Sequence, residues 1–125
     1  MIPLYIQKKE TTPSVVLDSS NNKFEIKGIS MAEDANIFYE DIINWIEEYC
    51  QNPNPKTVFD FTLDYYNSAS AKQILEILYD LIEIKDAGKE VLVRWHYESD
   101  NEDMQEAGQG FAAICKVPFE LIPFD

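Results

Sequence analysis

The chain has few basic residues. Ten Lys and Arg stand against 23 Asp and Glu among its 125 residues, so the formal net charge at pH 7 is −13. Because such a surface repels nucleic-acid phosphates and anionic lipid head groups, we expect neither nucleic acid nor a membrane among its partners. A basic face on another protein would complement this charge, although acidity alone also keeps a protein soluble.

Glycine and cysteine are also scarce. The four glycines form no Gly-rich loop of the kind that holds a phosphate, so we do not expect the chain itself to bind a nucleotide. The two cysteines, Cys50 and Cys115, lie far apart and show neither a C-x-x-C motif nor the spacing of metal ligands. We therefore expect two reduced thiols, no metal and no other cofactor.

No long hydrophobic run is present. The apolar stretch at the N-terminus ends at Lys8, too early for a signal peptide, and no segment approaches the ~20 apolar residues that span a bilayer. We therefore expect a cytoplasmic protein. Hydrophobic residues still make up 46% of the chain, and the one linker-like stretch, residues 51–55, is too short to separate domains. We expect residues 1–125 to form a single domain.

Helical and extended patterns alternate along most of the chain. Apolar residues recur at three- and four-residue spacing in the helical segments and at every second position in several of the extended ones. This order predicts an α/β fold: a mixed β-sheet with an N-terminal antiparallel hairpin and about three helices packed on it. The expected strands are residues 4–7, 14–18, 23–29, 57–65, 90–97 and 119–124, and the expected helices are residues 34–49, 70–85 and 101–114.

Two details refine this prediction. Lys23, Glu25 and Lys27 share one side of their strand, opposite apolar residues, which indicates a strand covered on one face only. Gly108 and Gly110 lie inside the third helical segment and weaken the expectation of a regular helix there, since glycine is a poor helix former.

The segment after the buried strand 57–65 carries the most chemical information. It brings small hydroxyl residues to a turn that opens a helix, at the sheet edge where open α/β folds carry functional groups. A phosphate on Ser68 would meet unpaired backbone N–H groups and the positive end of the helix dipole, with Lys72 close in sequence. The alternative is structural: Ser68 or Ser70 is simply the N-cap, and Ser70 with Gln73 fits a capping box.

His96 is the only histidine, and it raises the alternative of a small hydrolase. Ser68, His96 and an acid could form a Ser-His-Asp triad, but no G-x-S-x-G motif surrounds Ser68 and no Gly-rich oxyanion loop is present. A single histidine on a strand is more often structural or part of a binding surface. The acidic run 98–106 lacks the spacing of an EF-hand loop and is better explained as a solvated helix start. We expect no enzymatic activity.

Three motifs stand out: Leu63-x-Tyr65-x-Asn67-Ser68-x-Ser70-x-Lys72, Arg94-Trp95-His96-Tyr97 and Pro118-Phe119. They resemble motifs of the SiaC family of bacterial regulatory phosphoproteins. Thr12-Pro13 and the helix that contains Trp45 also lie where the family has similar features, so the resemblance covers nearly the whole chain. The first two motifs together are fairly specific.

The resemblance implies a STAS-like fold, as in anti-sigma-factor antagonists, and a non-enzymatic role in partner switching and biofilm regulation. In the family, a partner kinase phosphorylates a threonine after the Asn, and a PPM-type phosphatase removes the phosphate. In the best-understood branch, the unphosphorylated form binds and activates a diguanylate cyclase.

The residue that matches the family's phosphorylated threonine is Ser68, which keeps the hydroxyl and lacks the methyl group. Ala69 follows it, where family members often have another hydroxyl. The resemblance therefore implies phosphorylation of Ser68 and, as partners, a kinase, a phosphatase and a downstream protein effector. The residues expected to bind these partners are Tyr66, Asn67, Ser68, Ala69, Ser70 and Lys72. A constitutive adaptor, with Ser68 only a helix cap, is the alternative.

Overall fold

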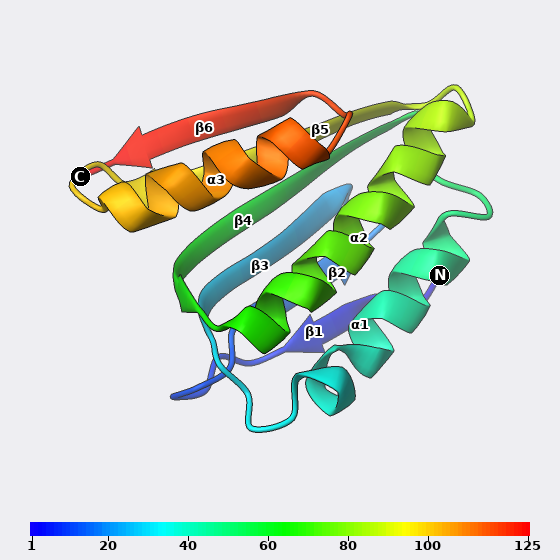
Figure 1. The fold of residues 1–125 in the computed structure, drawn as a ribbon. Helices are drawn as coiled ribbons and strands as arrows, with labels where there is room; N and C mark the ends of the chain where they lie inside the picture. The colour runs from blue at the N-terminus through cyan, green and yellow to red at the C-terminus, as the bar shows by residue number, and fades with distance from the viewer.

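All six strands belong to one sheet, in which they follow one another in chain order (Figure 1). The structure, a computed structural model, describes residues 1–125. β1, β2 and β3 pair antiparallel, whereas β3, β4, β5 and β6 pair parallel, so the predicted mixed sheet with an N-terminal hairpin is confirmed. The elements are β1 (Leu4–Ile6), β2 (Ser14–Asp18), β3 (Lys23–Ser30), α1 (Ala35–Tyr49), β4 (Lys56–Tyr66), α2 (Ser68–Asp86), β5 (Glu90–Glu98), α3 (Glu102–Ile114) and β6 (Phe119–Phe124).

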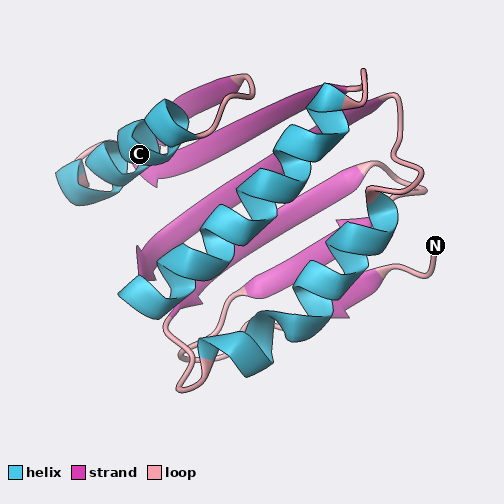
Figure 2. Cartoon of the chain, turned by 45° about the vertical axis from the view of Figure 1, so that its right-hand side comes forward, coloured by secondary structure: helices cyan, strands magenta, loops and turns pink.

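The three helices cover the same face of this sheet (Figure 2). Each helix connects one parallel strand to its immediate neighbour, and each crossover advances in the same direction across the sheet. Because such crossovers are right-handed, they place every helix on one side. The opposite side, which we call the open face, carries the polar side chains of β3, β4 and β5. None of the helices combines the length and the hydrophobicity needed to cross a bilayer.

The core lies between the helices and the sheet and is rich in aromatic rings. Phe24 of β3 stacks against Phe59 of β4 with ring centroids 6.2 Å apart, and Phe61 packs against Trp95 of β5 at 5.6 Å. All four rings are at most 1% exposed. The predicted apolar stripe of the first helix is part of this core, and the indole of Trp45 also donates a hydrogen bond of 2.8 Å to the carbonyl of Ile2.

Helix α3 is continuous despite its two glycines. A Cβ atom on Gly108 would lie 2.5 Å from the Leu121 side chain and 2.6 Å from that of Trp95, whereas one on Gly110 would meet nothing within 4 Å. Gly108 therefore allows α3 to approach β5 and β6 closely. The two glycines therefore do not interrupt the helix, and at Gly108 the close helix–sheet packing leaves no room for a side chain.

Candidate functional site

The turn between β4 and α2 lies at the carboxyl edge of the parallel part of the sheet. β4 is a central strand, paired with β3 on one side and β5 on the other. After it ends, the backbone N–H of Asn67 donates to the carbonyl of Ser30, 3.1 Å away, so the turn is tied to the end of β3. This edge is where open α/β sheets present functional groups.

Asn67 is the N-cap of α2, and α2 begins at Ser68, two residues earlier than expected. The Asn67 side-chain oxygen accepts a hydrogen bond of 2.9 Å from the backbone N–H of Ser70. Gln73 donates instead to the side chain of Asn36 on α1, at 2.6 Å. The structure therefore contradicts both capping alternatives: neither Ser68 nor Ser70 caps the helix, and no capping box forms with Gln73.

Ser70 is completely buried and joins three elements. Its hydroxyl donates to the carbonyl of Ser30 at 2.8 Å, and the Ser30 hydroxyl donates back to the Ser70 oxygen at 2.9 Å. The Ser30 hydroxyl also shares a hydrogen bond of 2.6 Å with the phenol of Tyr39 on α1, whose pKa burial raises to about 12. Ser70 thus links α2 to β3 and α1. Ser70 is one of the residues predicted to bind a partner, but its side chain is buried and therefore cannot contact one.

Ser68 has the opposite surroundings. It is exposed, and its hydroxyl forms no hydrogen bond within the protein. The backbone N–H groups of Ser68 and Ala69 belong to the first turn of α2 and have no partner inside the helix. Lys72, one turn further on the same side of the helix, is exposed as well. A phosphate on Ser68 would find N–H donors, the positive end of the helix dipole and an ammonium group within one turn.

The remaining predicted residues differ in exposure. Ala69 is exposed, and Tyr66 and Asn67 are half-buried. The Tyr66 ring packs against Trp95 and Phe111, with centroid distances of 6.3 and 5.9 Å, so much of it belongs to the core. The exposed part of the predicted set is therefore Ser68, Ala69 and Lys72.

Three exposed apolar side chains share this edge, and two of them went unnoticed in the sequence. Met31 follows β3, Tyr65 lies near the end of β4, and Ile37 lies in the first turn of α1; they are 41, 52 and 70% exposed. Of the three, Tyr65 alone falls within the motif that carries the family resemblance. Large apolar side chains beside a polar helix end are typical of a surface that docks another protein.

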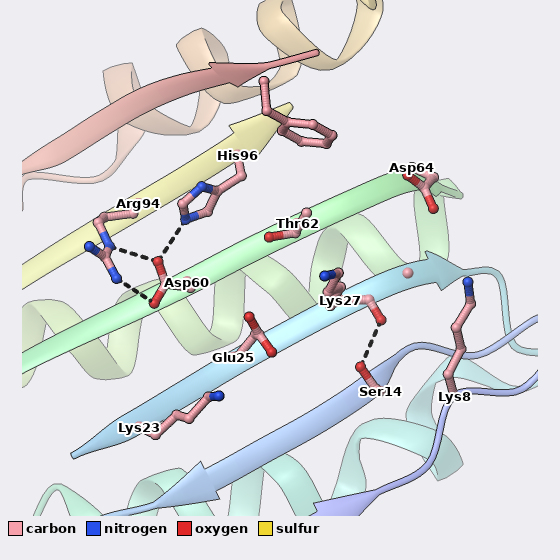
Figure 3. Close-up of a pocket in the computed structure, with 12 residues that line it drawn as sticks. Lys8, Ser14, Lys23, Glu25, Lys27, Asp60, Thr62, Asp64, Arg94 and His96 are labelled. Carbon is pink, nitrogen blue, oxygen red and sulfur yellow. Dashed lines mark hydrogen bonds and ion pairs between the residues drawn. The ribbon is translucent and has the colours of Figure 1, made fainter. Parts of the chain in front are cut away.

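The open face holds a second polar cluster, centred on Asp60 of β4 (Figure 3). Arg94 donates to both Asp60 oxygens, at 2.7 and 2.9 Å, and His96 Nε2 lies 2.7 Å from one of them. Burial raises the pKa of Asp60, but the hydrogen bonds from Arg94 and His96 outweigh it, and the pKa is lowered overall. These residues line a hollow of about 740 Å³ together with side chains of β3.

This arrangement contradicts the hydrolase alternative. His96 points to the open face and is bonded to Asp60, whereas Ser68 belongs to α2 on the helix-covered face. The sheet lies between the two side chains, so they cannot form the nucleophile–base pair that covalent catalysis needs. Arg94 and His96 fall within one of the family motifs, but the sequence did not reveal that they bind Asp60, because only the parallel pairing of β4 with β5 brings the three residues together.

Fold and site together define a small α/β domain that presents a free serine hydroxyl at an exposed helix N-terminus. The chain belongs to the SiaC family of regulatory phosphoproteins, whose family model matches residues 6–124. An uncharacterized protein of Pseudomonas aeruginosa (strain UCBPP-PA14) is 29% identical to it over 125 residues, which are 100% of this chain and 99% of that protein.

Two solved structures from Pseudomonas aeruginosa are similar over almost their whole length. Apo-SiaC is 28% identical, with a TM-score of 0.89 over 98% of this chain and 99% of that one. The second structure is of the diguanylate cyclase SiaD in complex with its activator SiaC. The matching chain is 28% identical, with a TM-score of 0.90 over 97% of this chain and 99% of that one.

Proposed function

We propose that this chain is a partner-switching phosphoprotein that is reversibly phosphorylated on Ser68. A protein kinase transfers the phosphate and a PPM-type phosphatase removes it. The observation that carries the proposal is the exposed, unbonded hydroxyl of Ser68 in the first turn of α2. The family resemblance adds to it, because Ser68 matches the position of the family's phosphorylated threonine, and the same resemblance underlies our expectation of a STAS-like, non-enzymatic domain.

The downstream partner in this proposal is a diguanylate cyclase, by extension from the relative that activates SiaD. The unphosphorylated form binds the cyclase through the edge that contains Ser68, Lys72 and the exposed side chains of Met31, Ile37 and Tyr65. Such a surface offers apolar contact area around a small neutral hydroxyl.

Phosphorylation changes this edge in two ways. It adds about −1.5 to −2 charges at neutral pH, and it adds three strong acceptor oxygens. The first turn of α2 holds the phosphate through its free N–H groups and Lys72, so the modified helix end stays folded. A partner that buries the same edge must then desolvate the phosphate, which is unfavourable unless it supplies cations of its own. Phosphorylation therefore releases the cyclase.

Mass spectrometry of the protein purified from its native host tests the phosphorylation directly. We expect phosphate on Ser68 and none in a Ser68→Ala variant. Binding to the cyclase is then compared for Ser68→Ala, Ser68→Asp and a matched control, Ser20→Asp, in the exposed β2–β3 turn. We expect Ser68→Asp to bind at least about tenfold more weakly, or about 1.4 kcal/mol, and Ser20→Asp to bind like the wild type. Equal binding of the two Ser68 variants would contradict the switch.

A further inference from the structure

Helices α1 and α2 approach each other again well away from Ser68. Cys50 is the C-cap of α1, and its thiol donates to the main-chain carbonyl of Asp80 on α2, 3.5 Å away. Glu83 lies three residues after Asp80, so the two carboxylates point from the same side of the helix. The Cys50 sulfur and one carboxylate oxygen from each acid all lie within 4.8 Å of one another.

One oxygen in this cluster lacks a partner. Asp80 Oδ2 exposes less than 1 Å² and forms no hydrogen bond. Buried polar atoms are nearly always paired, so an unpaired carboxylate oxygen in a native structure requires an explanation, such as a bound ion. No Lys, Arg or His forms an ion pair with Asp80, because the ion pairs of the protein are those of Asp60.

The charges around Asp80 are all of one sign. Burial and, to a lesser extent, the carboxylates of Glu47, Glu83 and Glu76 together raise the pKa of Asp80 to about 7. Burial and the neighbouring acids likewise raise the pKa of the Cys50 thiol to about 12. A divalent cation bound by Asp80 and its neighbours would offset this repulsion.

We propose that Cys50, Asp80 and Glu83 form a binding site for a divalent transition-metal ion of the Zn²⁺ type. A sulfur ligand disfavours Mg²⁺ and Ca²⁺, which prefer all-oxygen sites, whereas Zn²⁺ takes thiolate and carboxylate together. Zn²⁺ bonds of about 2.0–2.3 Å bring ligand atoms to about 3.3–3.8 Å from one another. The cluster must therefore contract by roughly 1 Å, which the exposed Glu83 side chain can provide. Water completes the tetrahedron.

Binding exchanges a proton for the metal. The sulfur–metal bond forms as the S–H bond of Cys50 breaks, and the proton passes to solvent, so each bound ion releases one thiol proton. The site joins residues 30 positions apart on two helices and stabilises their contact when it is filled. It involves none of the residues of the phosphorylation proposal and does not depend on it.

Titration of the reduced, chelator-treated protein with Co²⁺ tests this site, because a thiolate ligand gives cobalt a charge-transfer band in the near ultraviolet. We expect one equivalent to produce the band, Zn²⁺ to abolish it, and Zn²⁺ to raise the melting temperature. Cys50→Ser should lose the band and the melting shift, and Glu83→Gln should bind at least about tenfold more weakly. Cys115→Ser and Glu106→Gln, an exposed position on α3, are the matched controls and should bind like the wild type.

Three outcomes would overturn the site. One is the absence of a charge-transfer band in the wild-type protein. The second is a band that survives in Cys50→Ser but disappears in Cys115→Ser. The third is unchanged affinity in Glu83→Gln, an exposed position whose substitution leaves the core intact.

Discussion

Helices α1 and α2 lie side by side and run parallel, and the two ends of this helix pair differ in chemistry (Figure 1). At their start, Ser68 presents a hydroxyl and free N–H groups, which suit an anion. Towards the end of α1, Cys50 faces Asp80 and Glu83, which suit a cation. The helix dipoles favour an anion at the N-terminal ends, which are positive, and a cation at the C-terminal ends, which are negative.

The two places also differ in how they are encoded. Ser68 and Lys72 belong to one continuous motif, so the anion end is visible in the sequence. The thiol of Cys50 reaches Asp80 only because two helices pack together, and 30 residues separate the pair. Local chemistry can be predicted from a motif, whereas chemistry assembled from separate elements needs the fold.

A substitution in α3, away from both ends, separates a general loss of stability from a loss of either site. We expect Gly108→Ala to lower the free energy of unfolding by about 2–3 kcal/mol, because its methyl group would collide with Trp95 and Leu121. Gly110→Ala, whose added carbon meets nothing, should raise it by up to about 1 kcal/mol. Urea denaturation measures both. Equal effects of the two substitutions would contradict the packing described for α3.

Ser68 and Ser70 lie in the same turn of α2, one exposed and one buried, and their alanine substitutions should differ in their effect on stability. Ser70→Ala should lower the free energy of unfolding by about 1–2 kcal/mol, because it breaks the buried hydrogen bonds to Ser30. Ser68→Ala should change it by less than about 0.5 kcal/mol, since that hydroxyl is unbonded. If chemical denaturation instead showed Ser68→Ala to be the more damaging, Ser68 would be structural after all.

A substitution of Asp80, in the proposed metal site, should stabilise the metal-free protein, whereas Gly108→Ala and Ser70→Ala destabilise it. In metal-free protein, Asp80→Asn should raise the free energy of unfolding, because it removes a carboxylate that other acids repel. We expect a gain of about 1 kcal/mol, since solvent screens the charge of a partly exposed group. With Zn²⁺ present the variant should be less stable than the wild type. Thermal denaturation with and without Zn²⁺ measures this reversal, and the same ranking in both conditions would argue against the site.

A substitution on the open face should leave both ends of the α1–α2 pair unaffected and should change the free energy of unfolding least. Asp60→Asn removes the ion pair with Arg94 and should cost about 1 kcal/mol or less at pH 7, as is usual for a partly exposed pair. Because folding lowers the pKa of Asp60, this stabilisation is present above the unfolded pKa and disappears as pH falls through the folded value. Wild type and variant should therefore converge in acid-side urea titrations, and a constant difference would exclude this ion pair as the cause.

Most of the fold was predictable because it depends on local patterns. Alternation of polar and apolar residues located β3 and β5 to within one residue at each end, and the helical stripes located α1 and α3 equally well. The start of α2 was misplaced because Ser70 resembles a cap in sequence, whereas hydrogen bonds with Ser30, which Tyr39 also binds, hold Ser70 in the core. Those contacts span elements, and no local pattern encodes them.

The candidate site was predictable only in part, for the same reason. Ser68 stands in a continuous motif, and the structure places it at the exposed start of α2. The cap function of Asn67 was missed because Asn, Ser and Thr are all good caps and a sequence of several such residues does not show which one is used. Met31 and Ile37 reach the same edge from β3 and α1, so only the parallel pairing of the strands reveals them.

The central claim is that phosphate on Ser68 controls the effector. Its most direct test is calorimetric titration of the diguanylate cyclase with two forms of this protein, one unmodified and one stoichiometrically phosphorylated on Ser68 by its kinase. We predict that the unmodified form binds and that phosphorylation weakens binding at least about tenfold, with recovery after treatment by a PPM-type phosphatase. Indistinguishable dissociation constants for the two forms would contradict the account.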